Sequence, residues 1–360
     1  MYIQVRHQIF KKTPEHLSLL QVWDIRENEL SPIGCEAIDI LDKGDLKDAN
    51  LYKEAAWSGS AIQEFQDLLD LTFPKTGRFF NVHYLFFESL SAFRESVLSG
   101  LNGQLQASLA VLRAGLEMFT FHLWWRERLR FEDSFEPFYD WLFGLKGSPP
   151  FKNVIDSVFE NPDMPLSGTT KDTFDALYGK LCAYAHKPLI DQAITSLKGT
   201  NLTIVNTEVL YFWLDLLQNT QRVVLDLAVS NSPMCLFPLP LHTKFGFNPP
   251  VGVFFDKANF LSLEMSLGAE RLKSYQDHFR SREPVVTLLP WFNGFPDRSE
   301  REILSSWADG EPLGHEGKSF EERVFLGFGM QKAKMRALLM GFAYKPNAPS
   351  IESLYRPPQI

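Results

Sequence analysis

The chain of 360 residues carries 45% apolar, 14% aromatic and 22% charged side chains, with a formal net charge of −8. This composition excludes an extensively disordered chain, and the acidic balance disfavours non-specific binding to nucleic acid. The length fits two or three domains, or one elaborated domain.

Residues 1–75 are predicted to form a small α+β N-terminal region. Three short segments have β-like composition, namely Tyr2–Val5, Leu20–Ile25 and Ala37–Leu41. Farther along, apolar residues recur at helical spacing and predict a helix over Ala61–Thr72. The sequence Pro74–Gly77 then interrupts the periodicity.

Residues 81–230 are predicted to form a helical bundle. An apolar stripe at spacings of three and four begins near Asn81, and it is formed by Leu85, Phe86, Leu90, Phe93, Val97 and Leu101. Further helices are expected up to Arg130, over 134–145, over 151–160, over 171–186 and over 207–229. Successive helices joined by loops are typical of a bundle.

Residues 231–360 are predicted to form an α+β C-terminal region. The apolar runs VGVFF (251–255) and FLSLEMS (260–266) suggest a hairpin, and Pro284–Leu289 suggests a strand. Helices are expected over Ala269–Arg280, Arg298–Trp307 and 319–343. The predicted fold class is therefore mainly α, with a helical core and α+β regions at both ends.

The same patterns bear on location and cofactors. The apolar segment 107–125 contains Arg113, Glu117 and His122, and each charge inside a membrane would cost about 2.5–3.5 kcal/mol. Three cysteines without paired spacing argue against a disulfide framework and against a thiolate zinc site. We therefore expect a cytoplasmic protein without a membrane partner, a metal or a cofactor.

Two helical segments carry the most informative polar residues. Arg113 and Glu117 lie four residues apart on one face of an apolar helix, where burying either charge alone is costly. His186 ends a later apolar helix that also contains Tyr178 and Tyr184, and a helix C-terminus favours a protonated histidine. We expect Arg113 and Glu117 to pair with each other or with a third polar group, and an acid such as Glu117 to be the neighbour of His186.

These two segments resemble the HEPN superfamily, in particular its uncharacterised and abortive-infection-like branches. An Arg-x-x-x-Glu helix there faces a later helix that ends in a Leu-x-x-Tyr-x-His-like signature, and the resemblance covers residues 82–230. It implies a bundle of four to five helices that is frequently dimeric, and a role in prokaryotic defence or stress with RNA as a partner. Active members are metal-independent ribonucleases that use an arginine and a histidine four to six residues apart.

This chain departs from the catalytic pattern, because no arginine lies within six residues before His186. Lys180 stands there instead, and lysine supplies charge without the bidentate fork of arginine. A ribonuclease would use His186 as general acid or base, with Lys180 or Arg113 stabilising the phosphorane, Glu117 beside them, and Tyr178 and Tyr184 binding substrate.

Several functions therefore remain open. One is an RNA-related role in which the C-terminal region binds a protein partner. Another is a non-catalytic interaction or assembly module in which Arg113, Glu117 and His186 form a structural cluster. A third is an enzyme with a pocket containing His242 or Trp291. Cys182, four residues before His186, is expected to be a core residue, and Asp215 is a candidate buried acid.

Overall fold

The computed structural model describes the following residues: 18–43, 51–63, 78–130, 136–160, 169–186, 207–231, 236–237, 244, 257–282, 285–309, 319–320 and 323. The chain forms two compact units. Unit 1 contains 1–66, 81–232 and 261–274, and unit 2 contains 67–80, 233–260 and 275–360.

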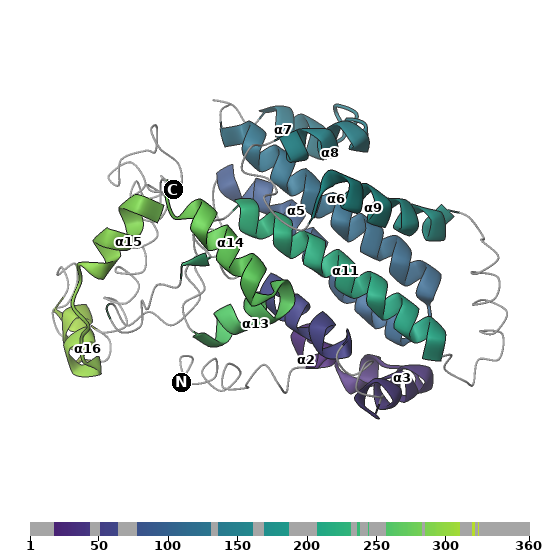
Figure 1. Ribbon diagram of the computed structural model, residues 1–360, viewed down its shortest axis with the longest axis horizontal. Coiled ribbons are helices and arrows are strands. Elements are labelled where there is room, and N and C mark those ends of the chain that lie inside the picture. The colour runs from purple at the N-terminus through teal and green to yellow at the C-terminus, as the bar shows by residue number, and fades with distance from the viewer. Residues whose placement is uncertain are drawn as a thin grey trace. The chain divides into compact units, whose positions relative to one another are not determined.

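Unit 1 contains the helical bundle, which confirms the predicted core (Figure 1). Its helices are α5 (Arg78–Leu101), α6 (Leu105–Arg130), α7 (Glu136–Leu142), α8 (Phe151–Glu160), α9 (Lys171–His186) and α11 (Thr207–Asn231). Helix α6 packs against α8, α9 and α11, and α9 also packs against α8 and α11. The two helices singled out from the sequence, α6 and α9, are therefore direct neighbours.

The apolar stripe of α5 drives its packing. All six of its predicted members are at most 5% exposed. Burial of one such side chain contributes about 1.5–3 kcal/mol, so the stripe is a main source of bundle stability.

Helix α9 begins after Thr170, whose hydroxyl oxygen accepts a hydrogen bond from the Thr173 amide at 3.2 Å and so caps the helix.

Small residues allow α5, α6 and α11 to approach closely. The Ser108 hydroxyl donates to the Ser96 carbonyl at 2.7 Å and accepts from the indole Nε1 of Trp213, also at 2.7 Å. Gly100 lies against the same indole ring, where a Cβ atom would overlap it. Ser108 thus links three helices, and Gly100 leaves room for the Trp213 ring that Ser108 binds.

The N-terminal part of unit 1 is also helical. It contains α2 (Leu19–Val22), the 3₁₀ helix η2 (Glu27–Glu29), α3 (Pro32–Lys43) and a helix over 51–63. Arg94 of α5 donates to the Glu29 carboxylate at 2.7 Å, and the Asn102 amide oxygen accepts from the Ser31 amide at 2.7 Å. These bonds attach residues 29–31 to α5 and to the turn that follows it.

The β-strands predicted at the N-terminal end are wrong where the structure describes them. Leu20–Ile25 overlaps α2, which Ser18 caps by accepting from the Gln21 amide at 3.3 Å. Ala37–Leu41 lies inside α3, where Ala37 and Leu41 are each 1% exposed. Their spacing of four residues places both on the inner face of a helix. Tyr2–Val5 and 64–72 of the predicted helix lie outside the described residues.

The C-terminal helices are α13 (Lys257–Leu267), α14 (Ala269–Phe279), α15 (Val285–Asn293) and α16 (Glu300–Ala308). The predicted helices Ala269–Arg280 and Arg298–Trp307 are confirmed within two residues. The predicted strands at 260–266 and Pro284–Leu289 are wrong, since α13 and α15 occupy them. The described parts of both terminal regions contain helices and no strand, so their α+β assignment is not supported.

Two further predictions concern segments that the structure describes only in part. Residues 251–255 and nearly all of 319–343 lie outside the described residues. Among the described helices, none combines the length and the apolar composition that a membrane span requires.

Candidate functional site

The contact between α6 and α9 brings three polar side chains together. The Arg113 Nε atom lies 3.3 Å from Oε1 of Glu117, and the Tyr178 hydroxyl donates to that same oxygen at 2.6 Å. The Arg113 and Glu117 side chains are 20% and 27% exposed, so the ion pair is partly buried. The predicted pairing of Arg113 with Glu117 is confirmed, and Tyr178 is the residue of α9 that completes the contact.

The surroundings of Tyr178 keep its hydroxyl protonated. Burial, followed by the hydrogen bond to Glu117 and the interaction with Cys182, raises the pKa of Tyr178 above its ordinary value. Its ring lies 4.8 Å from that of Phe151, measured between centroids, and stacks near Phe174. A tyrosine in this state donates a hydrogen bond at neutral pH and does not act as a base.

The other predicted site residues of α9 are distributed along the helix. Lys180 is exposed, and Tyr184 packs against Phe212 of α11 with ring centroids 5.1 Å apart. His186 is the last residue of α9, and its side chain lies outside the described residues. It stands eight residues beyond Tyr178, about 12 Å along a helix. Its predicted proximity to Glu117 therefore stays a prediction.

The structure describes the side chains of three other residues that the sequence singles out, namely Cys182, His122 and Asp215. Cys182 is a free, half-buried thiol. His122 is 2% exposed and lies beside the rings of Phe86 and Phe119. Asp215 is exposed. His242 and the Trp291 side chain lie outside the described residues. Within those that are described, no three His, Cys, Asp or Glu side chains gather as metal ligands would.

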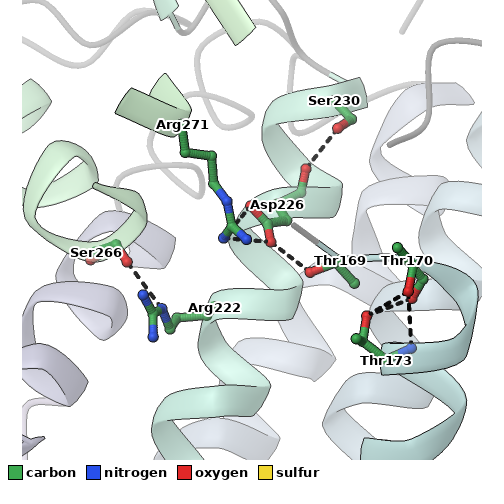
Figure 2. Close-up of polar contacts among 8 residues, drawn as sticks. All are labelled: Thr169, Thr170, Thr173, Arg222, Asp226, Ser230, Ser266 and Arg271. Carbon is green, nitrogen blue, oxygen red and sulfur yellow. Dashed lines mark hydrogen bonds and ion pairs between the residues drawn. The ribbon is translucent and has the colours of Figure 1, made fainter. Parts of the chain in front are cut away.

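A second polar cluster, which the sequence did not reveal, surrounds Asp226 of α11 (Figure 2). Asp226 is 2% exposed. Its Oδ2 atom accepts from the Thr169 hydroxyl at 2.5 Å and from Nη1 of Arg271 at 3.1 Å. Arg222 of the same helix donates from Nε to the Ser266 carbonyl at 3.2 Å. These contacts hold 261–274 against α11, and a carboxylate so engaged is structural.

An aromatic corner lies where α6, α7 and the start of α8 meet. We use this name for Phe121, Trp124, Trp125, Phe138, Tyr139, Trp141, Phe143, Leu145 and Phe151. Trp125 and Phe138 are buried, whereas Phe143 and Leu145, in the turn after α7, are 71% and 74% exposed. The Arg128 guanidinium lies 5.3 Å from the centroid of the Trp124 ring. The corner thus presents large apolar side chains to solvent.

An open hollow of about 260 Å³ lies at the other end of α8. Its lining consists of Asp156, Phe159, Glu160, Thr170 and Lys171. The Lys171 ammonium group lies 3.1 Å from Asp156 Oδ1 and 2.9 Å from Asp175 Oδ2, so these two acids neutralise it. Besides this ion-paired group, the lining contains the apolar Phe159 and the acidic Glu160.

Comparison with protein-family models, with curated proteins and with solved structures finds no match for this chain.

Proposed function

We propose that unit 1 is a non-catalytic interaction module. In this proposal, Arg113, Glu117 and Tyr178 form a structural clamp between α6 and α9, and the aromatic corner provides the surface for association. The resemblance of 82–230 to the HEPN superfamily stays a prediction, and RNA cleavage is the alternative activity.

One observation carries the proposal, namely that Arg113 and Tyr178 converge on a single oxygen of Glu117. A hydrogen bond to a charged group contributes about 1.5–3 kcal/mol, and partial exposure reduces this value. The clamp therefore directs a guanidinium and a hydroxyl toward the helix contact. In a phosphoryl-transfer site, such groups must instead point to the place where the negative charge develops.

The aromatic corner supports association as the role of the unit. Interfaces and their energetically dominant residues are enriched in tryptophan, tyrosine, phenylalanine and arginine. All four residue types are present here, with Arg128 over the ring of Trp124. Two exposed apolar side chains adjoin them. Contiguous exposed apolar patches on folded proteins mark interaction sites, and the corner is our candidate for such a patch.

RNA cleavage provides the test. The full chain is incubated with labelled single-stranded RNA in the presence of a chelator, beside His186→Ala and Tyr178→Phe variants. We expect no cleavage that depends on His186, because the clamp residues are engaged with one another. Tyr178→Phe is expected to lower the free energy of unfolding and to leave the RNA intact.

The contrary result would be distinctive. Cleavage by the wild-type chain that disappears in His186→Ala, with the melting temperature unchanged, would show a catalytic site at the end of α9. The proposal of a non-catalytic module would then be wrong.

A further inference from the structure

The outward face of α8 carries its charges in an ordered sequence. Lys152 and Glu160 are exposed, Asp156 lies between them at intervals of four residues, and Asn153 and Ser157 complete the face. The opposite face is buried and apolar, formed by Val154, Ile155 and Val158. The face is therefore positive where α8 begins and negative where it ends.

This order opposes the helix macrodipole. A helix favours acids at its N-terminus and bases at its C-terminus, typically by about 0.3–1 kcal/mol per charge at the surface. Lys152 and Glu160 occupy the reverse positions. Asp156 is engaged by Lys171, so the two end charges determine the polarity of the exposed face. Such an arrangement becomes favourable when a second helix of the same sequence lies antiparallel to it.

The apolar features around α8 also differ between its two ends, with a projection at the start and a hollow at the end. At the start of α8, the turn after α7 projects Phe143 and Leu145, and a Cβ atom added at Gly144 or Gly147 would meet nothing within 4 Å. At its end lies the hollow of about 260 Å³ beside Phe159. Because a cavity of about 150 Å³ holds a benzene molecule, this hollow has room for one phenylalanine ring.

We infer that α8 docks against α8 of a second copy of this chain, antiparallel across a twofold axis through the middle of the helix. Phe143 and Leu145 of one copy would meet the partner's Phe159, and Lys152 would meet the partner's Glu160. This inference rests on the proposed function as an interaction module, and it names the partner.

Symmetry makes the arrangement closed. A twofold axis requires that if one residue contacts another across the interface, the reverse contact also forms. Helix α8 has ten residues and is about 15 Å long, with the projecting turn at one end and the hollow at the other. Reversing the helix exchanges these ends, so each copy supplies and receives the same contacts. The end contacts therefore form twice in a dimer, and the Asp156 carboxylates of the two copies lie nearest the axis, each paired with Lys171 of its own copy.

Sedimentation velocity of the full chain over a range of concentrations tests the inference. The wild type should form a dimer. Lys152→Glu and Glu160→Lys should each weaken dimerisation by about tenfold or more, because symmetry places two like-charge contacts at the interface. At a concentration where wild type and variants are all monomeric, each variant should keep the wild-type melting temperature or exceed it, since either change agrees better with the macrodipole.

Mixing these two variants is the sharpest measurement. Across an antiparallel contact, the glutamates of Lys152→Glu face the lysines of Glu160→Lys at both ends, so the mixture should form a heterodimer of near wild-type affinity. The double variant Lys152→Glu/Glu160→Lys should also regain the dimer. If neither the mixture of single variants nor the double variant forms a dimer, the inference is overturned.

The projecting turn has its own variant and control. Phe143→Asp/Leu145→Asp should abolish the dimer, whereas Val286→Asp, at an equally apolar and 54% exposed position of α15, should not. A wild-type chain that stays monomeric overturns the inference, as does one that instead binds phosphatidylserine vesicles through the turn. Either result leaves the RNA test of the proposed function unaffected, so the two failures are distinguishable.

Discussion

At the scale of single residues, the Glu117 carboxylate connects sequence to structure. Its spacing from Arg113 predicted the ion pair, because residues four apart on a helix are neighbours. The bond from Tyr178 joins residues 61 positions apart. The sequence marks Tyr178 as a candidate but does not indicate its partner, because that contact depends on how α6 and α9 dock.

Asp215 and Asp226 show why helical phase alone does not predict burial. They are eleven residues apart on α11, which is close to three full turns, so they share one side of the helix. Asp215 is exposed, whereas Asp226 is 2% exposed because Thr169 and the 261–274 segment cover it. Both acids interrupt apolar stretches, and only tertiary packing distinguishes them.

Tyr52 provides a prediction at the residue scale. Burial raises its pKa from 10.0 to about 12, with the nearby Asp42 charge adding to the effect. Above pH 10 the unfolded chain loses this proton first, so stability is fully present below pH 10 and falls as the pH approaches 12. Between about pH 9 and about pH 11.5, wild type should lose roughly 2 kcal/mol more unfolding free energy than Tyr52→Phe. Urea unfolding at both pH values measures this difference, and equal losses would contradict it.

At the scale of helices, elements with a recurring apolar face were predictable, and short continuous apolar runs were not. Helices α8 and α9 match their predicted limits, since an apolar face recurs over several turns. The run at 260–266 suits a period of two as well as 3.6, and short apolar runs are ambiguous in this way. Leu263 and Leu267 are both buried four residues apart, so packing selected the helix α13.

Gly100 provides a prediction at the helix scale. A Cβ atom at this position of α5 would overlap the indole of Trp213, whose Nε1 donates to Ser108. Gly100→Ala should therefore lower the free energy of unfolding by about 1–3 kcal/mol, the usual cost of overpacking. Gly179→Ala on α9 is the matched control, because nothing lies within 4 Å of its added Cβ. It should raise stability by about 0.5–1 kcal/mol. Chemical denaturation compares them, and a neutral Gly100→Ala would refute the close packing.

At the scale of the whole molecule, the bundle brings side chains from distant segments into defined contacts. The Asp226 cluster fastens 261–274 to α11, and the clamp fastens α9 to α6. Contacts that span so many residues stabilise the unit as a whole, so their loss should appear in global unfolding. In the proposed function, the aromatic corner and the outward face of α8 serve association.

A double-mutant cycle between Glu117 and Tyr178 tests the central claim, a structural clamp, most directly. Glu117→Met removes the carboxylate at similar length and Tyr178→Phe removes the hydroxyl, while the effect on Arg113 cancels within the cycle. The account predicts a coupling energy of about 1–2 kcal/mol in the free energy of unfolding, below the value for a fully buried bond because Glu117 is 27% exposed. Additive effects, with a coupling below about 0.5 kcal/mol, would contradict it.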